Sequence, residues 1–128
     1  MKVIHFTAGA GDALWGHGNR KVGFVPLLQT GAGAHVGCIH LEKNSHWPEQ
    51  CFENECALLV IQGKAVVWTH CRLDMSAGVG IAFEPHERFS VDSEEGAILL
   101  LMECKGLEAT EVAISTPARI MGQKWPGE

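Results

Sequence analysis

The stretch from residue 46 to residue 56 concentrates side chains that can do chemistry. Its imidazole, thiols and carboxylates belong to His46, Glu49, Cys51, Glu53, Glu55 and Cys56. Thiolates and a carboxylate can together bind zinc, and a thiol beside a base can act as a nucleophile. Paired carboxylates can serve as general acid and base when burial separates their pKa values. The alternative is that the cysteines are small buried core residues and the acidic run is a solvated loop.

Short apolar segments separated by glycines predict the elements that must position these side chains. Fifteen glycines occur in the chain, and strands that recur at about ten-residue spacing are typical of an all-β sandwich or barrel. No stretch in the first hundred residues shows a sustained helical repeat of apolar positions. We predict strands over Lys2–Phe6, Lys21–Leu28, His35–Leu41, Ala57–Gln62, Ala65–Thr69, Gly80–Phe83, Phe89–Asp92 and Ala97–Cys104.

The connections between these strands carry weaker signals. Gln62-Gly63-Lys64 predicts a hairpin turn, because glycine tolerates the positive φ that tight turns require. Near the C-terminus, Glu111–Ser115 could form a further short strand. A short helix within Thr110–Gln123 is the alternative, with Pro117 interrupting it. Eight or nine short strands around one core predict a jelly roll or a related closed barrel.

Composition excludes several classes of function. The chain has 128 residues, 46% of them hydrophobic and 20% charged, which suits one globular domain. Its formal charge is −5, and no segment concentrates Lys and Arg, so we expect no binding to nucleic acid. The longest apolar runs are far shorter than a membrane span, so we expect no contact with membranes.

The cysteines and the N-terminus suggest a compartment. The N-terminal residues contain no sustained apolar core of the kind found in signal peptides. We therefore expect a cytoplasmic protein, in which the five cysteines are mostly reduced thiols.

With these strands placed, residues Leu41 to Gly63 resemble the first conserved motif of the cupin superfamily, a family of small jelly-roll barrels. Gly63 matches the glycine that ends that motif. The run from Gly78 to Val91 resembles the second motif, which has a glycine, a strand, a turn and a single histidine. The resemblance covers residues 20 to 104 and implies one cupin-like domain over 1–128, with the N-terminal strand and C-terminal tail peripheral.

The family's metal ligands are a His-x-His pair, a Glu and the single histidine of the second motif. Counting back from Gly63 places Glu49 and Cys51 at the His-x-His positions and Cys56 at the Glu position. Counting from the second-motif glycine places Phe89 where the family has its histidine. Because none of the four is the family's residue, we expect no metal centre and no other cofactor.

A substituted metal set is the alternative. His86 lies in the turn before Phe89 and could complete a tetrahedral zinc or iron site with Glu49, Cys51 and Cys56. Glu49 and Cys51 are two residues apart, so on a strand both side chains point to one face. A slip of one residue would turn both outward and bring Gln50 and Phe52 inward.

The resemblance implies a ligand pocket inside the barrel, near the stretch described first. We expect it to be lined by His40, Trp47, Glu49, Cys51, Cys56, His86, Arg88 and Phe89. Small residues recur at strand positions and would leave room for a ligand.

Taken together, these features predict a cupin-like barrel that binds a small molecule without the usual metal and assembles as a homodimer. The alternative is a metal-dependent enzyme of the oxygenase or isomerase type that uses the substituted ligands. The sequence leaves open whether the protein is an enzyme.

Overall fold

Nine antiparallel strands and one short helix make up the described part of this computed structural model, which comprises residues 1–5, 12–13 and 22–114. The elements are β1 (Asp12–Ala13), β2 (Val22–Gln29), β3 (His35–Leu41), β4 (Ser45–Cys51), β5 (Cys56–Trp68), β6 (Arg72–Ser76), β7 (Gly80–Phe83), β8 (Arg88–Ser93), β9 (Ala97–Glu103) and α1 (Glu111–Ile114). In this part of the chain, no helix has the length and apolar character needed to cross a membrane.

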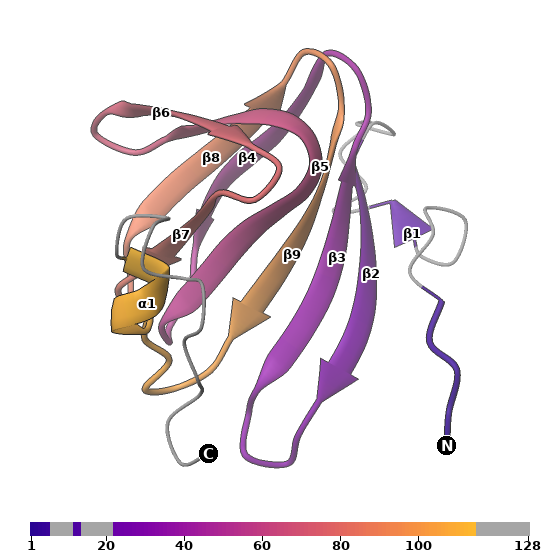
Figure 1. Cartoon of the computed structure of the whole chain (residues 1–128), viewed down its shortest axis with the longest axis vertical. Coiled ribbons are helices and arrows are strands. Elements are labelled where there is room, and N and C mark those ends of the chain that lie inside the picture. Colours follow the sequence, from indigo (N-terminus) through magenta and orange to yellow (C-terminus); the bar gives the residue numbers. More distant parts are fainter. Residues whose placement is uncertain (6–11, 14–21, 115–128) are drawn as a thin grey trace.

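The sheet curls over so that its two ends face each other as two layers. Figure 1 shows it running from β2 and β3, through β9 and β5, to β8 and β4. We call the part formed by β1, β2, β3, β9, β7 and the first half of β5 the first layer. The second layer contains β4, β8, β6 and the second half of β5. This curled all-β arrangement is the jelly-roll architecture that the strand spacing predicts.

Strand β5 passes from one layer to the other without a turn, so the predicted hairpin at Gln62-Gly63-Lys64 is wrong. Gln62 and Gly63 pair with Ile98 and Ala97 of β9, and the register shifts between Val60 and Gln62. Gly63 has φ +84°, and a Cβ at this position would lie 2.2 Å from the carbonyl oxygen of Gly96. Gly63 therefore lies within a continuous strand, just after the bulge between Val60 and Gln62, where its positive φ and its close approach to the Gly96 backbone leave no room for a side chain.

Other segments also differ from the sequence-based expectations. The acidic stretch expected to be a loop contains β4, and β6 was not predicted. Residues 2–5 are not a strand, while Phe6 lies outside the described residues. Residues 111–114 are helical, which agrees with the alternative of a short helix within Thr110–Gln123 and not with a short strand, and residues 115–128 lie outside the described residues. Strands β3 and β7 have the predicted bounds.

The core lies between the two layers and is built by the inward face of each strand. Alternate residues of β9, from Ala97 through Leu99 to Leu101, are buried, as strand geometry requires. The side chains of β4 and β8 add bulky aromatic rings. Trp47 and Phe89 contact each other edge to face with ring centroids 5.8 Å apart, and Phe83 stacks on Phe89 at 4.2 Å. Because each fully buried large apolar side chain contributes about 1.5–3 kcal/mol, this aromatic cluster stabilises the junction of the layers.

Candidate functional site

The register of β4 determines which of the predicted site residues point into the barrel and which point outward. Gln50 pairs with Phe89 and Cys51 pairs with Arg88, with an irregularity in the register between Trp47 and Gln50. Residues directly opposite each other in an antiparallel pair point to the same face. Phe89 is in the core and Arg88 is exposed. The structure therefore places Gln50 inward and Cys51 outward.

Glu49 also lies on the exposed side of the second layer. It falls within the irregular part of β4, and its side chain is 60% exposed. One carboxylate oxygen lies 3.8 Å from the guanidinium of Arg88. This is a surface ion pair, which contributes little to stability because both charges remain solvated.

Cys56 stands apart from these residues because it faces the core. Its exposed fraction is 2%, and it packs with the buried residues of both layers. Burial, together with the negative charges of Glu103 and Glu87, raises the pKa of the Cys56 thiol to about 12. The thiol is therefore protonated at neutral pH, and a protonated thiol is neither a good metal ligand nor a good nucleophile.

The two histidines of the predicted pocket lie in different places. His86 is exposed, has φ +66°, and donates its backbone N–H to the carbonyl oxygen of Phe52 at 2.8 Å. His40 pairs with Gly23 and Ile98 in the first layer. Its Nε2 lies 3.5 Å from Sγ of Cys38. Because Ile39 and Leu41 belong to the core, the intervening His40 points to the outer face of that layer.

The substituted metal set does not fit a shared ion in this arrangement. Cys56 points into the core, whereas Glu49 and Cys51 are on the exposed side of β4. Across residues 1–5, 12–13 and 22–114, no three His, Cys, Asp or Glu side chains come close enough together to hold a metal. The position where the family has its histidine is occupied by the ring of Phe89, which stacks on Phe83.

A cavity of about 550 Å³ opens at one end of the barrel, where β2 and β9 end and β5 begins (the lower end in Figure 1). We call it the mouth cavity. It is lined by Phe24, Pro26, Leu27, Leu28, Gln29, His35, Val36, Gly37, Phe52, Leu101 and Glu103. The residues predicted to form the pocket do not line it. Phe52 lines the mouth cavity and also contacts Phe89, one of the predicted pocket residues, because their rings stack with centroids 6.1 Å apart.

Four residues in register across the first layer mark the inner rim of this end. Glu103 lies opposite both His35 and Cys56, and Cys56 lies opposite Phe83. Since Cys56 and Phe83 are in the core, Glu103 also points toward the inside of the barrel. The sequence contained a signal for this: Glu103 continues the inward series Ala97, Leu99 and Leu101 with a carboxylate.

One wall of the mouth cavity depends on a glycine. A Cβ on Gly37 would lie 2.2 Å from Cε2 and 2.5 Å from Cζ of Phe24. The ring of Phe24 therefore lies directly against the backbone of β3, in space that any other residue would occupy. Gly37 and Phe24 both line the cavity, so a side chain at position 37 would displace one of its walls.

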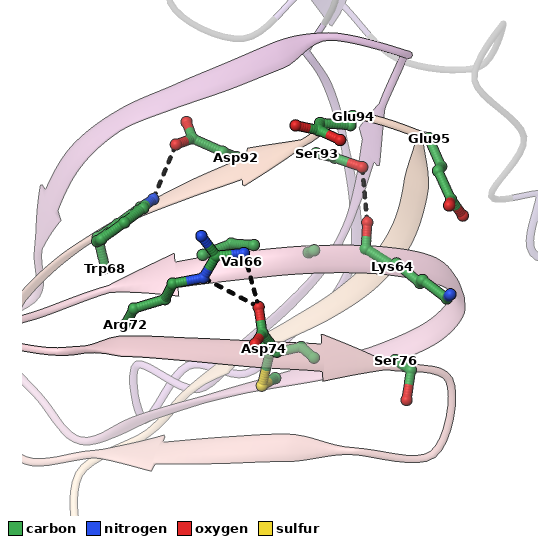
Figure 2. A pocket seen from close by; sticks show the side chains of 12 residues that line it. Lys64, Val66, Trp68, Arg72, Asp74, Ser76, Asp92, Ser93, Glu94 and Glu95 are labelled. Atoms are coloured by element: carbon green, nitrogen blue, oxygen red, sulfur yellow. Dashed lines mark hydrogen bonds and ion pairs between the residues drawn. The ribbon is translucent and has the colours of Figure 1, made fainter.

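A second hollow, of about 480 Å³, lies on the outer face of the second layer (Figure 2). The indole N–H of Trp68 donates to Oδ2 of Asp92 at 2.8 Å, and the other oxygen of Asp92 contacts Nδ1 of His46. Arg72 donates to Asp74 at 3.1 Å and lies 5.6 Å from the centre of the Trp68 ring. These polar groups already bind one another. Trp68 and His46 reach Asp92 across strands, and Arg72 and Asp74 pair along β6.

A neighbouring cleft of about 420 Å³ brings Glu49, Arg88 and Phe89 together with His46 and Trp68. It is shallow and lies on the same outer face. Compared with these two polar hollows, the mouth cavity combines apolar walls with few polar groups, which is the usual composition of small-molecule sites. We therefore take the mouth cavity as the candidate functional site.

No protein-family model and no curated protein matches the sequence. Among solved structures, an RmlC-like cupin from Shewanella frigidimarina matches with a TM-score of 0.64 at 16% identity, covering 81% of this chain and 93% of its own. A cupin superfamily protein from Desulfitobacterium hafniense matches with a TM-score of 0.63 at 14% identity, covering 68% and 80% respectively.

A third similar structure is KdgF from a Halomonas species, with a TM-score of 0.59 at 15% identity, covering 79% of this chain and 94% of its own. At these identities the likeness concerns the path of the backbone. It agrees with the curled sheet and with the two motifs identified around Gly63 and Gly78. The protein has the fold of the cupin superfamily, a jelly-roll barrel.

Proposed function

We propose that this protein binds a small organic molecule in the mouth cavity. The observation that supports this most directly is the cavity itself, whose volume of about 550 Å³ suits a small molecule. Its walls are largely apolar, and a few polar side chains such as Gln29 and His35 stand at the rim. Apolar walls favour burial of the ligand, and isolated polar groups orient it.

Binding at this site requires no metal. The inward residues near the family's ligand positions are Gln50, Cys56 and Phe89. Cys56 and Phe89 pack in the core, and Gln50 donates its side-chain N–H to the carbonyl oxygen of Pro48 at 2.7 Å. The deep interior is filled by stacked rings, so the ligand occupies the end of the barrel and not its centre.

A paired substitution of two glycines tests this proposal. Gly37→Ala places a methyl group where the Phe24 ring lies, so the ring must move and the cavity changes shape. Gly23→Ala adds the same methyl on the neighbouring strand, where the nearest atom is Cβ of His40 at an ordinary 3.9 Å. Saturation-transfer NMR with a panel of uncharged and charged aromatic and branched-alkyl fragments measures binding to the wild type and to both variants.

We expect fragments to bind the wild type and Gly23→Ala, and to lose most of their saturation transfer with Gly37→Ala. Circular dichroism melting shows whether each variant is folded at the temperature of the experiment. Equal binding to two folded variants would place the site elsewhere. Absence of binding to the wild type by every fragment would contradict the proposal outright.

A further inference from the structure

The ionisable groups at the mouth cavity indicate which class of molecule fits it. Resting on the function proposed above, we infer that the ligand is a small organic cation, with an ammonium group beside Glu103 and an apolar body against the aromatic walls. Three features of the described lining support this inference: an inward carboxylate, the absence of Lys and Arg, and two aromatic rings.

The carboxylate of Glu103 lines the cavity from the end of β9. It shares the inward face with Cys56 and is half-buried. Within the described part of the chain, its side chain forms no hydrogen bond and no ion pair. A partly desolvated carboxylate without an internal partner is stabilised by a ligand that brings a positive charge or N–H donors.

The described remainder of the lining has one side chain that could carry a positive charge, His35, which lies opposite Glu103. Among the described residues around the cavity, none is Lys or Arg, and His35 is the one basic side chain. A second carboxylate, that of Glu87, is close enough to act on the Cys56 thiol together with Glu103. The carboxylates of Glu103 and Glu87 therefore favour a cation over an anion near Cys56.

The aromatic walls also favour a positively charged ligand. Phe24 and Phe52 both line the cavity. Aromatic rings attract cations through the negative potential of their faces, most strongly when water is excluded. A carboxylate with two phenyl rings in one cavity is therefore complementary to a primary, secondary or quaternary ammonium group that carries methyl or methylene groups.

Two probes of equal shape, one charged and one neutral, show how much the positive charge contributes to binding. Choline and 3,3-dimethyl-1-butanol differ in having N⁺ or carbon at the branched centre, so both should enter the cavity if size and apolar contact alone decide. We expect choline to bind at least about tenfold more tightly than the alcohol, as cation–aromatic and carboxylate contacts allow. Chemical-shift titration of the full chain measures both dissociation constants.

Two glutamate variants complete the test. Glu103→Gln keeps the shape of the side chain and removes its charge, so the preference for choline should fall to about threefold or less. Glu94→Gln makes the same charge change in an exposed residue of the outer hollow, outside the mouth cavity, and should keep the preference. Melting curves confirm that both variants are folded.

The outcomes separate this inference from the proposed function. If both probes bind equally, or if Glu103→Gln keeps the preference for choline, the inference about charge is overturned while the cavity remains a binding site. If the alcohol binds and choline does not, the charge inference is likewise overturned. If neither probe binds, the inference is overturned and the fragment panel alone decides the proposed function.

Discussion

Cys56 lies on the inward face near the mouth cavity, and the pKa of its thiol is clearly raised. Its sulfur is buried among apolar residues, and the carboxylates of Glu103 and Glu87 disfavour a further negative charge nearby. The sequence suggested Cys51 and Cys56 as partners, because both are thiols in one short stretch. The structure separates them: Cys51 shares the outer face with Arg88, and Cys56 faces the core.

This difference predicts unequal reactivity of the two thiols. With its pKa raised to about 12, Cys56 has about one thiolate in ten thousand molecules at pH 8. It is also shielded from reagent. We expect iodoacetamide at pH 8 to label exposed Cys51 at least about a hundredfold faster than Cys56 in the folded protein. Peptide mapping by mass spectrometry at timed intervals measures both rates.

Labelling in urea, where the chain is unfolded, is the control and should bring the two rates within a few-fold of each other. Rapid labelling of Cys56 in the folded state would contradict its placement in the core. It would also reopen the possibility that Cys56 is a reactive thiol.

Among the elements, the long strand β5 determines how the two layers meet. Its first half pairs with β9 and its second half with β8 and β6. The sequence predicted apolar strands on both sides of Gly63, because local apolar character is visible in the chain. Whether a glycine reverses a strand or bends it depends on the partner strand, and β9 is more than thirty residues away in sequence.

The register of β4 likewise depends on a partner strand that is distant in sequence. Its acidic residues and Pro48 resemble a loop, yet buried Ser45 and Trp47 alternate with exposed neighbours as in a strand. The irregular pairing after Trp47 sets the register and so determines that Gln50 and not Cys51 points inward. A bulge of this kind arises from pairing with β8, which a single sequence does not reveal.

The bend at Gly63 can be tested by substitution. Gly63→Ala forces a side chain into the left-handed region at φ +84° and brings its Cβ within 2.2 Å of the Gly96 carbonyl oxygen. We expect the free energy of unfolding to fall by about 2 kcal/mol or more. Urea unfolding followed by circular dichroism measures the change.

Gly31→Ala is the matched control, because no atom lies within 4 Å of a Cβ built there and its φ is not in the left-handed range. Its free energy of unfolding should change by about 0.5 kcal/mol or less. Equal stability of both alanine variants would contradict the claim that the positive φ of Gly63 and its close approach to the Gly96 backbone exclude a side chain there.

For the whole molecule, the curled sheet forms the mouth cavity at one end and exposes the outer faces of its two layers. The outer face of the second layer carries the network of Trp68, Asp92 and His46. Ile61, in the first layer, is an exposed apolar residue of the kind found at contacts between proteins. The homodimer expected from the sequence stays a prediction, and light scattering showing a monomer at high concentration would contradict it.

The central claim is that the mouth cavity, and not the outer face of the second layer, binds the ligand. The most direct measurement is an NMR titration of the ¹⁵N-labelled protein with the tighter of choline and 3,3-dimethyl-1-butanol. We predict saturable shifts of the backbone amides of Gly37 and Glu103, with the indole N–H of Trp68 unchanged. Saturable shifts of the Trp68 indole with the Gly37 and Glu103 amides unchanged would contradict the claim and move the site to the outer hollow.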